Sequence, residues 1–165
     1  GLERKLVVTI GEDIIFTGKY DKVEWEDEGK GLVRIIDYKT GKPDDHLKAI
    51  KNFPDLASSE CDGYLRQLVA YKLLFERDKK ESRGRRAKSG ALVFVEPVNA
   101  ELKNYGYKKG EYATKAVDIS DDTVEELERI VKDTWSNIKQ LKFEKLPERD
   151  KDICAKCDFD TICWG

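Results

Sequence analysis

The sequence predicts an α/β domain in which a mixed β-sheet is covered by helices. Residues 5–39 are mostly apolar and β-branched, a broad helical stripe occupies residues 60–77, and a further strand and an amphipathic helix come later. Strands, a helix, a strand and a second helix with few crossings are typical of layered α/β folds. At 165 residues the chain has the length of one domain, which buries about 70% of its unfolded surface.

Residues 5–39 are expected to form three strands joined as a meander. The segments KLVVTI, IIFTGKYDKVEW and LVRIIDYK are extended in character, and GED and DEGKG separate them as turns. With the hairpin loop at residues 27–31, Glu26 lies opposite Leu32. Counting back along this antiparallel ladder sets Asp21 opposite Asp37.

The rest of the chain alternates helices with strands. Residues 44–59 contain Pro54 and are expected to form a loop with a short helix. Apolar side chains at positions 64, 68, 71 and 75 predict a helix over residues 60–77 that packs on the sheet. The polar stretch 77–90 is expected to be a solvated loop, and ALVFVEPV a buried strand that Pro97 ends.

The second helix is the clearest in the sequence. Residues 99–115 predict a loop or irregular hairpin, and KAVDI a further strand. Ser120 then predicts an N-cap, acidic residues follow in the first turns, and an amphipathic pattern runs to Leu141. We expect residues 1–149 to form the core of the domain and residues 150–165 its cysteine-bearing tail.

The charge balance excludes a strongly basic or acidic protein. Lys and Arg number 31 against 33 Asp and Glu, so any basic surface must be local. No apolar run is long enough for a membrane span, and no signal peptide opens the chain, so we expect a soluble, cytoplasmic protein without a membrane partner. The sequence begins with Gly1 and contains no methionine, so we expect it to be a fragment of a longer protein.

Asp37 and Lys39 lie at the end of an apolar strand. Charged side chains are seldom buried there unless they are paired, bind a ligand or have a function. Carboxylates directly opposed across a ladder repel each other, so Asp21 beside Asp37 is not an arrangement kept for stability. A Mg²⁺ or Mn²⁺ ion between them would turn the repulsion into ligation. Lys39 shares a face with Asp37, and this set suits phosphodiester hydrolysis. A slipped register, with the acids on opposite faces, is the alternative.

Gln67 and Tyr71 lie one turn apart on the same face of the first helix. A glutamine amide and a tyrosine hydroxyl beside core positions both need hydrogen-bond partners. Such a pair either belongs to a site on this face or merely ties the helix to neighbouring backbone.

A basic segment follows this helix and contains Arg83, Arg85, Arg86 and Lys88. These side chains could neutralise DNA phosphates and make binding dependent on salt. A solubilising surface loop is the alternative. No base-reading motif accompanies the segment, so cleavage is expected to be independent of sequence.

Cys154, Cys157 and Cys163 give a C-x2-C-x5-C pattern near the end of the chain, and Cys61 lies far upstream. Clustered intracellular cysteines favour metal binding over disulfides. Both tetrahedral zinc and an iron–sulfur cluster require a fourth ligand. For Cys61 we expect a buried thiol outside any metal site.

Three stretches in order, GKYD with Asp21, IIDYKTG with Asp37 and Lys39, and QLVAY with Gln67 and Tyr71, resemble the PD-(D/E)XK nucleases of the RecB type. This group includes the nuclease domains of the AddB and RecB helicases and CRISPR-associated exonucleases. The tail CAKCDFDTIC is similar to the cysteine signature of that group.

The resemblance implies a restriction-endonuclease-like mixed sheet flanked by helices, with the N-terminal helix of the family absent from this chain. It implies that Asp21, Asp37 and the Tyr38 carbonyl bind the metal and that Lys39 is the catalytic lysine. Gln67 and Tyr71 would support the site and contact DNA.

The same resemblance bears on the cofactors. In this group a 4Fe-4S cluster takes three cysteines from the tail and one from before the nuclease core, so we expect an incomplete cluster here. A metal-site residue, usually His, lies on the family's upstream helix, and His46 follows Lys39 and cannot replace it. We therefore expect weak metal binding and poor cleavage by the fragment.

The expected function is that of a metal-dependent DNA nuclease domain, acting on single strands or duplex ends. The expected parent is a helicase-nuclease of recombination and repair, with a helicase domain or subunit as partner. An exonuclease of CRISPR adaptation and a non-cleaving DNA-binding or scaffolding module are the alternatives.

Overall fold

The computed structural model describes residues 4–49, 56–58, 61–142 and 145–165. The chain divides into two compact units, Gly1–Lys132 and Asp133–Gly165. The first unit holds both sheets and the hydrophobic core, and the second holds two short helices. The predicted division into a core of residues 1–149 and a tail of residues 150–165 stays a prediction.

The first unit contains a mixed four-stranded sheet and a separate two-stranded hairpin. Strands β1 (Arg4–Ile10) and β2 (Ile14–Tyr20) form the hairpin. The larger sheet has the order β3-β4-β5-β6, built from β3 (Lys22–Asp27), β4 (Leu32–Lys39), β5 (Arg86–Pro97) and β6 (Tyr112–Asp118). Its β4–β5 pair is parallel, and the other two pairs are antiparallel. The predicted mixed α/β fold is confirmed.

Two expectations for residues 5–39 were wrong. The segment forms four strands rather than three, because the chain bends at Asp21 and splits the expected long middle strand between two sheets. A bulge between Trp25 and Asp27 also places Asp27, not Glu26, opposite Leu32. The bulge adds one residue to the β3 side, while the pairs beyond it keep the predicted register, with Lys22 opposite Ile36.

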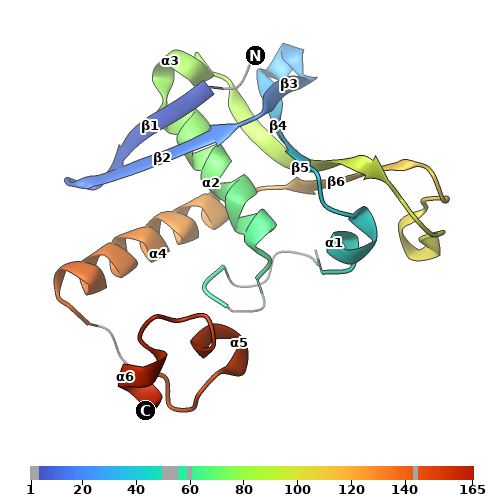
Figure 1. Cartoon of the computed structure of the whole chain (residues 1–165). Coiled ribbons are helices and arrows are strands. Elements are labelled where there is room, and N and C mark those ends of the chain that lie inside the picture. Colours follow the sequence, from blue (N-terminus) through green and yellow to red (C-terminus); the bar gives the residue numbers. More distant parts are fainter. Residues whose placement is uncertain (1–3, 50–55, 59–60, 143–144) are drawn as a thin grey trace. The chain divides into compact units, whose positions relative to one another are not determined.

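Helix α2 (Gly63–Arg77) crosses the sheet and the hairpin, as Figure 1 shows. Leu68, Leu74 and Phe75 lie in the core with Ile35 from β4 and Ile10 from β1. The helix begins after Asp62, whose carboxylate accepts a hydrogen bond from the amide of Tyr64. It therefore starts later than expected, and Cys61 lies buried just before it.

Two glycines allow α2 to approach the strands closely. A Cβ atom at Gly18 of β2 would overlap the Cδ1 atom of Leu74, and one at Gly90 of β5 would lie 3.1 Å from Leu68. A side chain at either position would push the helix outward. The glycine of the GKYD motif thus serves the packing of the helix that carries Gln67 and Tyr71.

The polar stretch 77–90 is not the loop that was expected. Helix α3 (Lys79–Ser82) follows α2 directly, and β5 begins at Arg86. Ala87 and Ser89 are buried while Arg86 and Lys88 are exposed, which is the alternation of a strand with one covered face. Charged side chains on the outward face had concealed this strand.

The remaining elements of this unit follow the predictions closely. Helix α1 (Pro43–Ala49) is the expected short helix, and residues 50–55, 59 and 60 lie outside the described residues. The short 3-10 helices η1 (Glu28–Lys30) and η2 (Lys103–Tyr105) lie within connections. Helix α4 (Asp121–Lys139) begins after Ser120, whose hydroxyl accepts from the amide of Thr123, and ends two residues before the expected end.

The second unit contains the end of α4 and the short helices α5 (Lys151–Cys154) and α6 (Asp160–Trp164). Arg149 donates two hydrogen bonds to Asp160, at 2.9 and 2.6 Å, and the ammonium of Lys145 lies 4.0 Å from the centre of the Trp164 ring. These two contacts connect the linker after α4 to α6. No helix among the described residues could span a membrane.

Candidate active site

The two predicted acids lie at the same end of the β3–β4 ladder. Asp37 and Lys39 close β4, and Asp21 occupies the bend just before β3. Since Lys22 pairs with Ile36, the ladder leads directly to Asp21 beside Asp37. The carboxylate of Asp21 accepts a hydrogen bond of 2.7 Å from the main-chain amide of Tyr38. The structure therefore brings Asp21 to the same end of β4 as the other predicted residues.

Asp37 is the buried carboxylate of the site, with 5% of its surface exposed. Its Oδ1 atom accepts hydrogen bonds from Gln67 Nε2 at 3.3 Å and from the Tyr71 hydroxyl at 3.2 Å. Its Oδ2 atom lies 2.5 Å from Lys39 Nζ as an ion pair but accepts no hydrogen bond of suitable geometry from the described residues. A buried carboxylate oxygen in this state retains lone pairs for a further cation.

Lys39 has three neighbours in this site. Besides Asp37, its ammonium donates a hydrogen bond of 2.6 Å to Gln67 Oε1 and lies 4.0 Å from the centre of the Tyr64 ring. Only 12% of the lysine side chain is exposed. The ammonium is thus held in a sparsely hydrated place, where such contacts are stronger than in water.

Gln67 and Tyr71 face the acids from α2. Gln67 Nε2 donates to the Tyr71 hydroxyl at 2.6 Å, as the spacing of one helical turn allows. Burial raises the pKa of Tyr71 to about 12, and the negative charges of Asp37 and Asp21 act in the same direction. The phenol therefore stays protonated near neutral pH and acts as a donor to Asp37.

Sequence reasoning did not identify the ring beside the lysine, Tyr64, or the ring that contacts Tyr64, His46. The helical periodicity places Tyr64 on the apolar face of α2, and the order of the motifs gives His46 no role. The His46 ring contacts two other rings, that of Tyr64 at 5.0 Å and that of Phe94 of β5 at 6.1 Å. The spacing of Tyr64 from Gln67, three residues, could have placed it on the site face.

The basic segment lies at the other end of the parallel strands. Arg86 pairs with Leu32 at the start of β4, whereas Asp37 pairs with Leu92. Six residues of extended strand separate Arg86 from Leu92, which is about 20 Å. The structure does not bring this segment together with the carboxylates.

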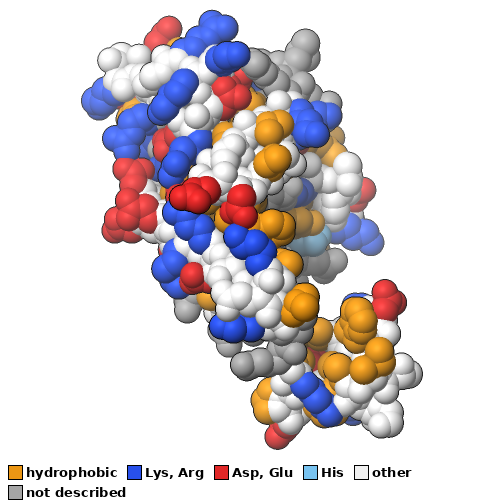
Figure 2. Space-filling view, turned by 90° about the vertical axis from the view of Figure 1, so that its left-hand side faces the viewer, with side chains coloured by type: hydrophobic (Ala, Val, Ile, Leu, Met, Phe, Trp, Pro, Cys, Tyr) orange, Lys and Arg blue, Asp and Glu red, His pale blue; other side chains and the backbone are white. Residues whose placement is uncertain are grey.

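All four basic side chains have acceptors within the chain. Arg85 donates to the carbonyls of Glu81 and Ser82, Arg86 pairs with Asp121, and Lys88 pairs with Glu26. Arg83 donates to the carbonyl of Lys80. On the face drawn in Figure 2, Lys and Arg side chains are interspersed with Asp and Glu side chains.

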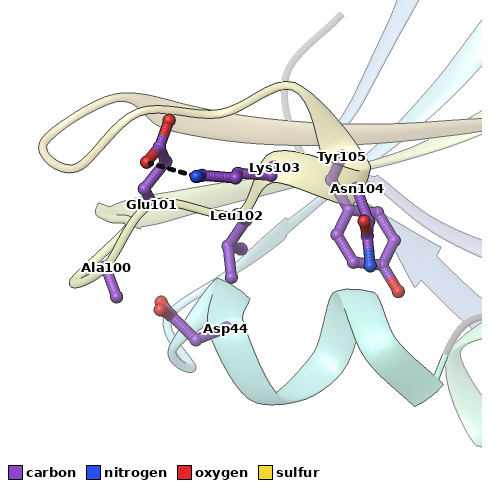
Figure 3. A pocket seen from close by; sticks show the side chains of 7 residues that line it. All are labelled: Asp44, Ala100, Glu101, Leu102, Lys103, Asn104 and Tyr105. Carbon is purple, nitrogen blue, oxygen red and sulfur yellow. Dashed lines mark ion pairs between the residues drawn. The ribbon is translucent and has the colours of Figure 1, made fainter.

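A groove of about 520 Å³ lies between α1 and the segment after β5, at the same sheet end as Lys39. Figure 3 shows Leu102 directed toward α1, with Asp44 below and Glu101 paired to Lys103. Two carboxylates against one ammonium do not favour a phosphate backbone in this groove.

The cysteines do not form a metal centre among the described residues. Cys154 is buried, Cys157 is exposed and Cys163 is half-buried. No three His, Cys, Asp or Glu side chains of the described residues are placed to hold one metal ion. Cys61 is buried, as expected, and its thiol donates to the Asp62 carbonyl. The residues present therefore do not fit an iron–sulfur cluster or a closed zinc site.

A Mg²⁺ or Mn²⁺ site between Asp21 and Asp37 is a different case. Such ions keep several water ligands and are commonly bound through one or two carboxylates, so two acids and a carbonyl are enough. The buried Asp37 Oδ2 atom, which accepts no hydrogen bond from the described residues and has only the Lys39 ion pair, is the observation that fits this group.

The fold and this polar cluster define a protein of the restriction-endonuclease-like class. The family model of the PD-(D/E)XK nuclease superfamily matches residues 1–164. The chain belongs to this superfamily.

Comparison with solved structures gave a similar chain, described as the crystal structure of SSO0001. It has 18% sequence identity and a TM-score of 0.42, over 98% of the present chain. The present chain spans 58% of its length. No curated protein matched the chain.

Proposed function

We propose that this chain is a Mg²⁺- or Mn²⁺-dependent deoxyribonuclease domain that hydrolyses phosphodiester bonds at single strands or duplex ends. Membership of the nuclease superfamily supports a nuclease domain with DNA as substrate. The metal dependence, the residue roles and the preference for ends belong to the proposal.

The observation that carries the proposal is the state of Asp37. A buried carboxylate whose Oδ2 atom has the Lys39 ammonium as an ion-pair partner but accepts no hydrogen bond from the described residues, at the same strand end as a second carboxylate, is costly for stability alone. In the proposed site Asp21, Asp37 and the Tyr38 carbonyl hold the cation. When bound, the cation would acidify a water molecule and neutralise charge on the phosphoryl group.

The other residues of the site have separate roles in the proposal. Lys39 stabilises the negative charge that develops on the phosphate. Gln67 aligns Lys39 through its carbonyl oxygen and Asp37 through its amide. Tyr71 donates a hydrogen bond to Asp37 and keeps the carboxylate oriented.

The test is cleavage of labelled single-stranded DNA with Mg²⁺ or Mn²⁺ by the native chain and by Asp37→Ala. We expect a loss of 10²-fold or more in the variant, because electrostatic stabilisation of this kind is worth roughly that much. Glu101→Ala is the matched control, since it removes an exposed carboxylate outside the site.

Equal cleavage by the native chain and Asp37→Ala would show that the acid is not catalytic. DNA binding without cleavage by both proteins would favour the alternative of a non-cleaving binding or scaffolding module. Because the sequence resembles RecB-type domains that contain an upstream metal-site residue, the same pair should be compared in a longer protein that carries this chain.

We also propose that the domain acts within a helicase-nuclease of recombination and repair, in the cytoplasm. The RecB-type motifs support this, and an exonuclease of CRISPR adaptation is the other candidate. The proposal also includes contacts with DNA away from the site, made by the basic residues Arg83, Arg85, Arg86 and Lys88. A 4Fe-4S cluster would form only in a parent protein that adds a fourth ligand to Cys154, Cys157 and Cys163. A Walker A motif in the parent would support the helicase.

A further inference from the structure

The face of the Tyr64 ring carries the ammonium of Lys39 at 4.0 Å from the ring centre. We infer that Tyr64 is a positioning residue that keeps Lys39 directed into the site, through a cation–π contact with the lysine. The contact itself is independent of any reaction, whereas its effect on rate rests on the proposed nuclease function.

The arrangement around the ammonium explains why a ring is useful there. The two oxygen neighbours, Asp37 Oδ2 at 2.5 Å and Gln67 Oε1 at 2.6 Å, both belong to polar groups of the site. A cation that shares Asp37 would weaken the first of these contacts. Gln67 and the Tyr64 ring would then remain, and the ring attracts the ammonium without competing for a metal ion.

Tyr64 is itself supported by neighbouring rings. The His46 ring, from α1, meets Tyr64 at 5.0 Å with 47° between the planes. The Phe94 ring of β5 stacks on His46, at 6.1 Å and 19°. Gly41 leaves room for this stack, because a Cβ atom there would lie 2.8 Å from His46 Nε2. The Tyr64 ring therefore packs against α1 through His46, and His46 in turn packs against the sheet through Phe94.

The first test measures the contact in the native chain by nuclear magnetic resonance. Protons above an aromatic ring are shifted upfield, so the Lys39 ε-methylene protons should be displaced and should show cross-relaxation with the Tyr64 ring protons. Tyr64→Phe should preserve the upfield shift and Tyr64→Leu should remove it. Tyr105→Leu, which alters an exposed tyrosine outside the site, should leave it unchanged.

Unshifted Lys39 ε-methylene protons in the native chain, with no cross-relaxation to Tyr64, would overturn the inference. This native measurement needs no variant, so it stands even where Tyr64→Leu fails to fold. Thermal unfolding of each variant separates a local change from a loss of structure.

The second test compares steady-state cleavage of DNA. Tyr64→Leu should lower kcat roughly tenfold with KM within about twofold of the native value, since a desolvated cation–π contact is lost. Tyr64→Phe should retain kcat within about twofold. An unchanged kcat in a Tyr64→Leu protein that has lost the upfield shift would overturn the positioning role. A shifted lysine together with no DNA cleavage, either by the native chain or by a longer protein that carries it, would instead overturn the proposed function.

Discussion

At the scale of single residues, position 67 needs a side chain that both accepts and donates. The carbonyl oxygen of Gln67 accepts from Lys39, while its amide nitrogen donates to Asp37 and Tyr71. A glutamate there would place another carboxylate beside Asp37 and would offer no donor. Position 67 therefore requires an amide side chain, which the glutamine of the QLVAY stretch supplies.

Tyr71 gives a prediction about alkaline stability in the absence of divalent metal. Its pKa is raised from 10.0 to about 12 in the folded chain, first by burial and then by Asp37. The unfolded chain therefore loses the phenolic proton first, so the stability that the neutral phenol contributes is present below pH 10 and is lost toward pH 12. Tyr71→Phe should lose less stability than the native chain over this range.

The measurement is denaturant unfolding of both proteins at pH 8 and at pH 11, with a chelator present. Tyr105→Phe serves as the control, because it removes the hydroxyl of an exposed tyrosine. A native chain and a Tyr71→Phe variant that lose stability in parallel would contradict the raised pKa.

At the scale of elements, a buried lysine fixes the start of α4. Lys72 of α2 is 3% exposed, and its ammonium donates to the Ile119 carbonyl at 2.7 Å and to the Asp121 carboxylate at 2.9 Å. Lys72 therefore joins the first residue of α4 to the middle of α2. The carboxylate also lies at a helix N-terminus, where negative charge is favourable.

The corresponding prediction concerns Asp121→Asn. We expect a loss of about 1 kcal/mol in the free energy of unfolding near neutral pH, since a buried ammonium loses its charged acceptor while solvent screens part of the pair. Asp122→Asn is the matched control at the next position. Chemical denaturation of the three proteins measures the difference.

The pH dependence of this loss has a definite sign. The hydrogen bond from Lys72 and its positive charge lower the pKa of Asp121 below 3.8. The stabilisation is then fully present above pH 3.8 and is lost as the pH falls through the lowered pKa. The native chain and Asp121→Asn should therefore converge in acid, and a gap that persists there would refute this explanation.

At the scale of the whole molecule, the site and the basic segment occupy opposite ends of the β4–β5 pair, about 20 Å apart. A DNA strand that touched both would have to run along the sheet. We expect Arg83→Ala to reduce the slope of log K against log salt for single-stranded DNA by about 0.7, the effect of one lost phosphate contact. Cleavage of an oligonucleotide too short to span the two ends should keep its kcat.

Fluorescence titration at several salt concentrations measures that slope, and the control is Lys109→Ala, which removes an exposed cation between η2 and β6, at the other end of β5 from Arg86. An unchanged slope in Arg83→Ala would remove this arginine from the DNA-binding surface. The acceptor that Arg83 has within the chain is a main-chain carbonyl, so the substitution leaves no carboxylate unpaired.

The sequence by itself determined the mixed α/β class, the two main helices and the order of the candidate site residues. Local pattern carries this information, because apolar periodicity and spacing within one element depend on near neighbours. The register from Lys22 to Ile36 was also predictable, since the hairpin between β3 and β4 is local. The same locality explains why Gln67 and Tyr71 could be placed on one face.

Only the tertiary structure decided the bend at Asp21, the hidden start of β5 and the ring beneath Lys39. The Asp21 carboxylate lies in the bend before β3 and accepts a hydrogen bond from the amide of Tyr38 in β4. Tyr64 contacts Lys39 from a helix that begins 24 residues later in the chain. β5 carries exposed charges and becomes a strand by pairing in parallel with β4. Each of these features depends on contacts between distant segments, which the pattern within a segment does not encode.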